Sequence, residues 1–167
     1  MENVKVILWG LGAMGGGIGK MITKKKGVDI VGAIDIGDKL GKSLYDVVPG
    51  MERGDREDVI VGTAEEVIKP KAADIVVVCT DSFTSKVFDK LKLVMENKMN
   101  VITSAEEMAF PQAQEPELAK KLDEITGKVL LSRCGRHSPD ELLDRQLLCR
   151  FERSETDQLC ERWLVSG

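Results

Sequence analysis

The chain has 167 residues, of which 43% are hydrophobic and 31% charged, and it carries a formal net charge of −4. This length suits one domain, or one and a fraction, and the negative charge gives no footprint for nucleic acid or an anionic membrane. No apolar run approaches the ~18 residues of a membrane span, and the glycine-interrupted start does not resemble a secretory signal, so we expect a cytoplasmic protein.

Cysteine and histidine content restricts the chemistry further. The four cysteines have no paired spacing, which indicates free thiols and not a disulfide framework. The chain has one histidine, His137, so a multi-histidine metal site is excluded and no metal is expected.

The first predicted element is a short buried strand, Val4–Trp9, which runs directly into a glycine-rich turn. The turn has the pattern G-x-G-x-x-G, with a helical pattern behind it over residues 13–26. Gly10 would allow a tight turn, Gly12 would let backbone approach a pyrophosphate, and Gly15 would let the helix pack close to the sheet. The unpaired N–H groups and the dipole of that helix favour an anion there.

A second strand is predicted over residues 28–35, and it ends in Asp35, 20 residues beyond Gly15. A carboxylate at this position typically accepts hydrogen bonds from the adenosine ribose of NAD. The alternative is that Asp35 only caps the strand. Its charge favours NAD over NADP, although Lys39 could reach a 2′-phosphate and offset the repulsion. We therefore expect NAD, with NADP tolerated.

The rest of the first 125 residues alternates between strand and helix patterns. The predicted strands are 59–61, 74–79 and 100–103, and the predicted helices are 44–48, one that begins after Thr63, 82–97 and 115–125. This order predicts an α/β fold with a doubly wound parallel sheet, the Rossmann arrangement.

Two loops leave predicted strands at the edge where ligands bind in such sheets. One contains Thr80 and Ser82, and the other contains Thr103 and Ser104. Their hydroxyl and N–H groups could line the nicotinamide ribose, although Ser82 could equally cap the helix that follows. Glu106 and Glu107 could be an acidic first-turn pair, and no catalytic residue is assigned.

Four segments together resemble the amino-terminal part of the dehydrogenases related to dihydrodipicolinate reductase. They are VILWGLGAMGGGI, VGAID, VVVCTDSF and NVITSAEEMAFP, and the resemblance covers roughly residues 1–125. Within that family, the last two segments point to a branch that oxidatively deaminates the C4 amine of 2,4-diaminopentanoate. The resemblance implies an NAD(P)-dependent amino-acid dehydrogenase of ornithine fermentation, which is a homodimer at full length.

The resemblance also implies which residues hold the cofactor. The pyrophosphate would lie on the glycine turn, the adenosine ribose on the following acid, and the nicotinamide end near the two later loops. The residues implied for the pyrophosphate are Gly10, Gly12, Ala13, Met14 and Gly15. Asp35 is implied for the adenosine ribose, and Thr80, Thr103 and Ser104 for the nicotinamide end.

The resemblance stops after about residue 125, and the composition changes with it. All lysines lie at or before Lys128, whereas the remainder carries six arginines and three of the four cysteines. We therefore expect a dinucleotide-binding domain over 1–125, and an atypical tail over 126–167 in place of an α+β substrate domain. A translational frameshift from about Leu131 would explain the tail, and a genuine helical tail is the alternative; His137 falls within it.

Three functions are compatible with these observations. The first is the amino-acid dehydrogenase, complete or as a fragment. The second is a dihydrodipicolinate reductase-like enzyme that reduces an imine or an aldehyde, because one fold supports many reactions. The third is a non-catalytic dinucleotide-binding module, although no basic recognition helix is evident in the sequence.

Overall fold

The computed structural model describes residues 3–125 and the backbone of 131–133. The chain divides into two compact units, residues 1–136 and 137–167. The second unit lies outside the described residues, and so do His137 and nearly all of the tail for which a frameshift was considered.

Six parallel strands form one sheet in the first unit. The spatial order is β3-β2-β1-β4-β5-β6, so the order reverses between β1 and β4. The strands are β1 (Val4–Trp9), β2 (Val28–Ile34), β3 (Val61–Gly62), β4 (Ile75–Val78), β5 (Asn100–Thr103) and β6 (Leu131–Arg133). This order is that of the Rossmann fold, which confirms the predicted fold class.

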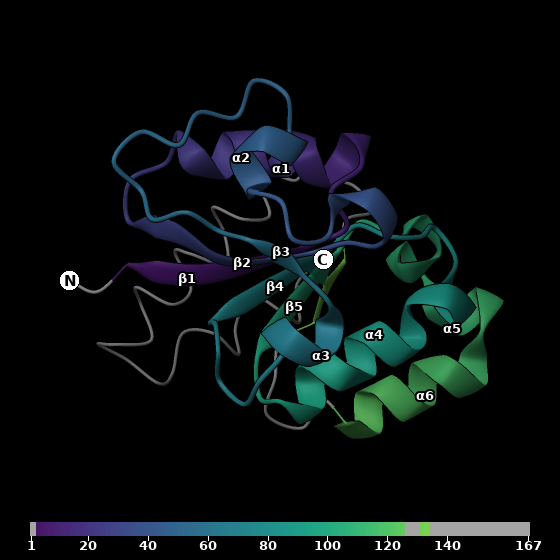
Figure 1. Ribbon diagram of the computed structural model, residues 1–167. Coiled ribbons are helices and arrows are strands. Elements are labelled where there is room, and N and C mark those ends of the chain that lie inside the picture. The colour runs from purple at the N-terminus through teal and green to yellow at the C-terminus, as the bar shows by residue number, and fades with distance from the viewer. Residues whose placement is uncertain (1–2, 126–130, 134–167) are drawn as a thin grey trace. The chain divides into compact units, whose positions relative to one another are not determined.

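Helices cover both faces of the sheet (Figure 1). On one face lie α1 (Ala13–Thr23) and α2 (Leu44–Val47), and on the other lie α3 (Ala64–Val67), α4 (Thr84–Glu96), α5 (Pro111–Gln114) and α6 (Pro116–Ile125). Two 3₁₀ helices, η1 (Gly37–Lys39) and η2 (Glu106–Ala109), follow β2 and β5. None of the described helices has the length and apolar character that a membrane span requires.

The central strands are apolar because both of their faces are covered. All four residues of β4 are buried, and α4 packs its predicted stripe of Val87, Leu91 and Val94 into the same core. Full burial of each such side chain contributes about 1.5–3 kcal/mol to stability. The core therefore fixes β1 and β4, the two strands whose carboxyl ends flank the reversal point.

Several local details differ from the prediction: the first helix ends at Thr23 and not at residue 26, and α5 was not predicted. The third strand is shorter than 59–61 and shifted, because Ile60 forms an isolated antiparallel bridge with Ser43 before the parallel pairing begins. The suggestion that Ser82 caps the helix after β4 is wrong: Phe83 holds that position. The predicted helix start after Thr63 is confirmed, with its N–H donating to the Glu66 carboxylate at 2.8 Å.

Candidate functional site

The loops that leave β1, β2, β4 and β5 are tied together at the carboxyl edge of the sheet. The N–H of Gly10 donates to the carbonyl of Ile34 at 2.8 Å, and the N–H of Cys79 donates to the carbonyl of Trp9 at 2.7 Å. The N–H of Ser104 donates to Val78 in the same way at 3.1 Å. In open α/β sheets, ligands bind at this edge where the strand order reverses. The fold therefore brings all the predicted site residues to one edge.

Gly10 and Gly15 are required by the packing of the protein itself. Gly10 has a φ of +96°, and a Cβ on it would lie 2.6 Å from the carbonyl oxygen of Cys79. A Cβ on Gly15 would lie 1.7 Å from the carbonyl oxygen of Gly10. Both distances are far inside van der Waals contact, so α1 can start this close to β1 only with glycine at both positions.

Gly12 is different, because the described protein atoms do not require a glycine there. No described heavy atom lies within 4 Å of a Cβ built on Gly12. Gly12 is the N-cap of α1 and offers no side chain to the first turn, which contains no acidic residue. The unpaired N–H groups of that turn, at Ala13, Met14 and Gly15, are therefore left for an external anion. These residues fit the diphosphate of a dinucleotide.

Asp35 follows β2 and is bound to the glycine turn. Its side chain is 12% exposed, and its Oδ2 accepts from the N–H of Leu11 at 2.7 Å. The Nζ of Lys39 donates to the same oxygen at 2.7 Å and to the carbonyl of Leu11 at 3.2 Å. Oδ1 accepts from the N–H of Ile36 at 2.7 Å. The Asp35 carboxylate therefore does more than cap the end of β2, because it also binds the glycine turn through Leu11 and the side chain of Lys39.

The environment of Asp35 keeps it ionised. Burial acts to raise its pKa, but the hydrogen bonds from Lys39, Ile36 and Leu11, together with the charge of Lys39, outweigh it. The net result is a pKa below the ordinary 3.8. Asp35 is thus an anionic acceptor at neutral pH, as contact with ribose hydroxyls requires.

The three residues predicted at the nicotinamide end occupy the loops after β4 and β5. Thr80 is half-buried beside Gly10, with its Cγ2 3.1 Å from a Cβ built there. Thr103 is fully buried, and its Oγ1 accepts from the N–H of Ala105 at 3.2 Å. It therefore shapes the loop that carries Ser104, and its own hydroxyl is not exposed to a ligand.

Glu107 joins these two loops, a role that the sequence analysis missed. Its Oε2 accepts from the N–H of Thr84 at 2.8 Å, and its own N–H donates to the carbonyl of Ser82 at 3.2 Å. A residue after β5 thus caps the helix after β4. Sequence spacing gives no sign of this contact, because the two residues lie 23 positions apart.

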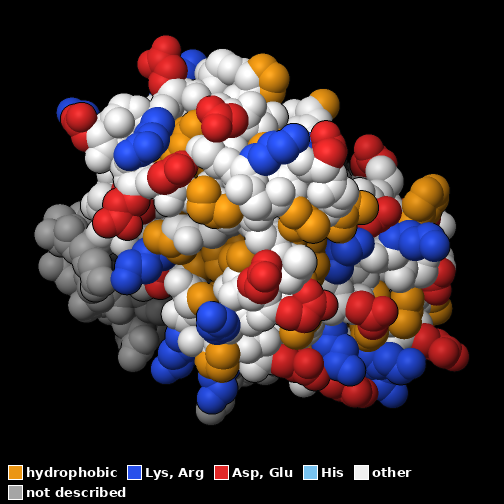
Figure 2. All heavy atoms as spheres, in the orientation of Figure 1, with side chains coloured by type: hydrophobic (Ala, Val, Ile, Leu, Met, Phe, Trp, Pro, Cys, Tyr) orange, Lys and Arg blue, Asp and Glu red, His pale blue; other side chains and the backbone are white. Residues whose placement is uncertain are grey.

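Exposed hydrophobic side chains accompany the site. Ile36, directly after Asp35, is 81% exposed, and Phe83 and Phe110 in the segments after β4 and β5 are also exposed. Figure 2 shows hydrophobic side chains reaching the surface across the middle of one face. Apolar walls with a few polar groups are typical of cofactor sites, so Ile36 is a candidate contact for an adenine ring.

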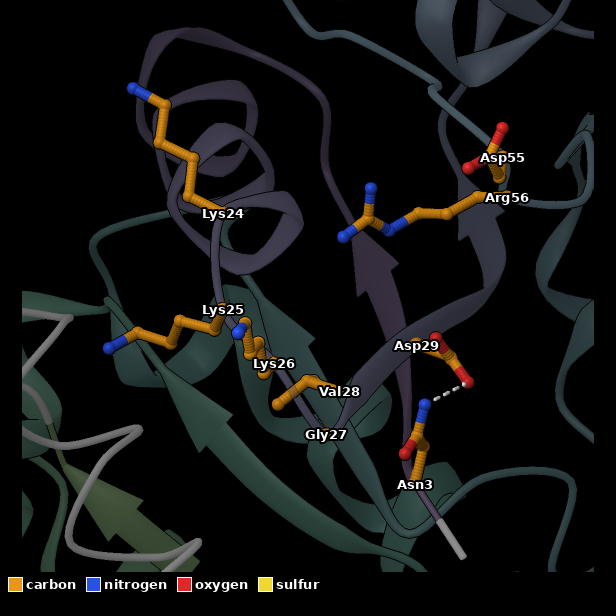
Figure 3. Close-up of a pocket in the computed structure, with 9 residues that line it drawn as sticks. All are labelled: Asn3, Lys24, Lys25, Lys26, Gly27, Val28, Asp29, Asp55 and Arg56. Carbon is orange, nitrogen blue, oxygen red and sulfur yellow. Dashed lines mark hydrogen bonds between the residues drawn. The ribbon is translucent and has the colours of Figure 1, made fainter.

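A separate hollow lies at the opposite edge, by the amino ends of β1 and β2 (Figure 3). Its lining combines four cations with two carboxylates: Lys24, Lys25, Lys26, Arg56, Asp29 and Asp55. Figure 3 shows that the Lys24 and Lys25 side chains extend away from Arg56 and do not converge on one point. We assign no ligand to it.

Comparison with characterised sequences places the chain beside one enzyme. No protein-family model matches it. Over 125 residues, it is 62% identical to 2,4-diaminopentanoate dehydrogenase of Acetoanaerobium sticklandii. This chain is similar to one part of that dehydrogenase. The match covers 75% of the chain and 35% of the A. sticklandii protein, so the chain spans about a third of its relative.

Solved structures agree with the fold. An amine dehydrogenase from Mycobacterium smegmatis superposes with a TM-score of 0.68 and 31% identity, over 78% of this chain and 38% of that one. GenD2 from gentamicin A biosynthesis, solved in complex with NAD, has a TM-score of 0.58 and 21% identity, over 91% of this chain and 40% of GenD2. The latter likeness concerns the fold alone.

Proposed function

We propose that residues 1–125 are the NAD(P)-binding part of a 2,4-diaminopentanoate dehydrogenase. The observation that carries this proposal is the 62% identity over 125 residues to the A. sticklandii enzyme. The glycine turn supports it independently, because the open space at Gly12 and the uncapped first turn of α1 fit a diphosphate.

Each predicted site residue has a role in this proposal. The N–H groups of Gly12, Ala13, Met14 and Gly15 would bind the pyrophosphate, and Gly10 would set the turn. Asp35 would accept from the adenosine ribose. The contacts with the nicotinamide end would come from the loops after β4 and β5. Thr80 and Ser104 would lie near the nicotinamide, and Thr103 would keep its loop in shape.

The proposed reaction is the oxidative deamination of the C4 amine. The chemistry that NAD(P)⁺ supplies, when bound, is acceptance of the hydride that leaves C4. Water then replaces the nitrogen, so 2,4-diaminopentanoate, NAD(P)⁺ and water give 2-amino-4-oxopentanoate, ammonium, NAD(P)H and a proton. The contribution of the described residues is to bind and orient the cofactor and to keep the carboxylate of Asp35 ionised. The full-length enzyme would be a homodimer, as the resemblance implies, and it would be cytoplasmic, as the sequence led us to expect.

A chimera tests this function directly. Residues 1–125 would replace the matching part of the A. sticklandii enzyme, and reduction of NAD⁺ and NADP⁺ would be followed at 340 nm with a panel of amines. We expect turnover that depends on 2,4-diaminopentanoate. In a second assay, oxidation of NADH or NADPH that depends on a cyclic imine or an aldehyde, without turnover of the diamine, would favour the reductase alternative. Cofactor binding without turnover of any amine would favour a non-catalytic module.

A further inference from the structure

Two exposed aromatic side chains lie in the segments that Glu107 joins. Phe83 directly precedes α4 and is 58% exposed, and Phe110 directly follows η2 and is 66% exposed. Single aliphatic side chains are common on protein surfaces, whereas aromatic side chains carry a large apolar area and are enriched where another protein surface covers them. Neither phenylalanine has a role in the cofactor site described above.

Hydrogen bonds through Glu107 hold the two phenylalanines in a fixed relation. The N–H of Glu107 donates to the carbonyl of Ser82 at 3.2 Å, and its carboxylate accepts from the N–H of Thr84 at 2.8 Å. Both chain neighbours of Phe83 are therefore bound to Glu107. The N–H of Phe110 donates to the carbonyl of Glu107 at 3.2 Å. The phenylalanine pair is thus pre-organised, which lowers the entropic cost of covering it.

The length of the relative and the course of the chain indicate what covers this pair. The match includes 35% of the A. sticklandii enzyme, so about two thirds of that enzyme lies outside it. Strand β6 is parallel to β5, with Arg133 opposite Thr103, so it ends at the carboxyl edge of the sheet. The segments of the phenylalanine pair follow β4 and β5 at the same edge. A polypeptide that continues from β6 therefore starts at the edge where the two rings are exposed.

We propose that Phe83 and Phe110 anchor the rest of the dehydrogenase polypeptide on this domain. The part of the enzyme beyond the matched residues packs on both rings. Because Glu107 also joins the loops that carry Thr80 and Ser104, that part is fixed to the segments predicted at the nicotinamide end. This inference rests on the proposed function, because the occupant is the remainder of that enzyme.

Hydroxyl-radical footprinting with mass spectrometry tests the anchor directly, because it reports side-chain accessibility independently of activity. The full chain is compared with the folded chimera described above, each with and without NAD⁺. We expect Phe83 and Phe110 to react at least about fivefold more slowly in the chimera, since anchors at the centre of an interface are fully desolvated. Ile60, exposed before β3, is the internal control and should react equally in both.

Substitution of both rings provides a second measurement. Phe83→Gln and Phe110→Gln are combined, and glutamine is used because serine or asparagine at Phe83 would cap α4. In the full chain, the double variant should keep the unfolding temperature within about 2 °C, since the rings are already exposed. In the chimera, it should lower that temperature by at least about 4 °C, through lost apolar burial. Ile60→Gln is the matched control and should have the same effect in both proteins.

Equal reactivity of the two phenylalanines in the chain and in a folded chimera would overturn the proposal, and oxidation of the diamine by that chimera would leave the proposed function intact. Protection without oxidation of the diamine would support the anchor and contradict the proposed function. Protection of the chain alone by NAD⁺, or by increasing protein concentration, would overturn the proposal, because the cofactor or a second copy would then be the occupant. If the chimera does not fold, the footprint of the A. sticklandii enzyme at the two aligned positions decides between the same outcomes.

Discussion

The Glu107 carboxylate accepts a hydrogen bond from the N–H of Thr84 at 2.8 Å, so a residue after β5 caps the helix that follows β4. The same residue donates its N–H to the carbonyl of Ser82. Two segments on neighbouring strands are thereby held as one unit. Because both contribute predicted residues of the nicotinamide end, the cap sets the local geometry of the site.

Replacement of Glu107 by alanine should destabilise the protein. The change removes the partner of an N–H at a helix start, which typically costs about 1 kcal/mol and up to about 2 kcal/mol. Urea unfolding followed by circular dichroism would measure it. Glu106→Ala is the matched control, because Glu106 is exposed and adjacent. Equal stabilities for the two variants would show that the cap contributes nothing.

Alanine at Gly12 should reduce dinucleotide affinity without destabilising the fold. The backbone of Gly12 has a φ of −75°, which alanine adopts readily, and no described atom lies within 4 Å of the new Cβ. The methyl group would instead occupy the space for the pyrophosphate and weaken its charge-assisted bonds, at a cost of about tenfold or more. Calorimetry with NAD⁺ and thermal unfolding would measure the two effects.

Two further glycines of α1 provide contrasting controls. Gly15→Ala places its Cβ 1.7 Å from the carbonyl oxygen of Gly10, so it should lower the free energy of unfolding by about 1–3 kcal/mol or more. Gly17→Ala has open space around it and should stabilise α1 by about 0.5–1 kcal/mol. A stability loss in Gly12→Ala comparable to that of Gly15→Ala would refute the distinction.

Ile36 should contribute to cofactor affinity and little to stability. Its side chain is 81% exposed directly beyond Asp35, where an adenine ring would cover it. We expect Ile36→Asn to weaken NAD⁺ binding by about three- to tenfold through lost apolar burial. Ile60→Asn is the matched control, since Ile60 is 53% exposed and precedes β3, outside the loop that follows β2. Similar affinities for the two variants would exclude an adenine contact at Ile36.

The lowered pKa of Asp35 predicts a pH-dependent contribution to stability. A carboxylate whose folded pKa lies below its unfolded value stabilises the fold fully above the unfolded value, and the contribution is lost as pH falls through the folded pKa. The advantage of wild type over Asp35→Asn should thus be constant above the ordinary value of 3.8 and shrink below it. Titration of the Asp35 carboxyl by ¹³C NMR would measure the pKa, which Lys39→Met should raise.

The sequence predicted the elements that depend on local patterns. The apolar run of β4 and the helical stripe of α4 were both recognisable, because burial of both strand faces leaves an unbroken apolar run and burial of one helix face leaves a period of about 3.6 residues. The glycine turn was equally visible from its G-x-G-x-x-G spacing, although the contact that requires Gly10 is with the distant Cys79 and only the contact that requires Gly15 is local. Ile60 shows the limit: its antiparallel bridge to Ser43 depends on a loop that precedes it, and no local pattern indicates that pairing.

The site was less predictable because its contacts are formed between distant segments. The sequence placed Asp35 at the end of β2, but its bond to Leu11 spans 24 positions and its acceptor positions are filled by neighbours. Thr103 was predicted beside the ligand, yet its hydroxyl is used inside the loop. Residue type and spacing locate such groups, whereas only the fold shows which of their hydrogen-bonding positions remain open.

Dinucleotide binding by the full chain tests the central claim most directly. Titration calorimetry with NAD⁺ should show one binding site per chain. Thermal unfolding would be measured in parallel at increasing NAD⁺ concentrations. The unfolding temperature should rise with ligand, by the equivalent of about 2.7 kcal/mol at 100 times the dissociation constant. In Gly12→Ala, about tenfold weaker binding should lower that gain to about 1.4 kcal/mol at the same NAD⁺ concentration. A folded chain that neither releases heat nor gains stability at millimolar NAD⁺ or NADP⁺ would contradict the account.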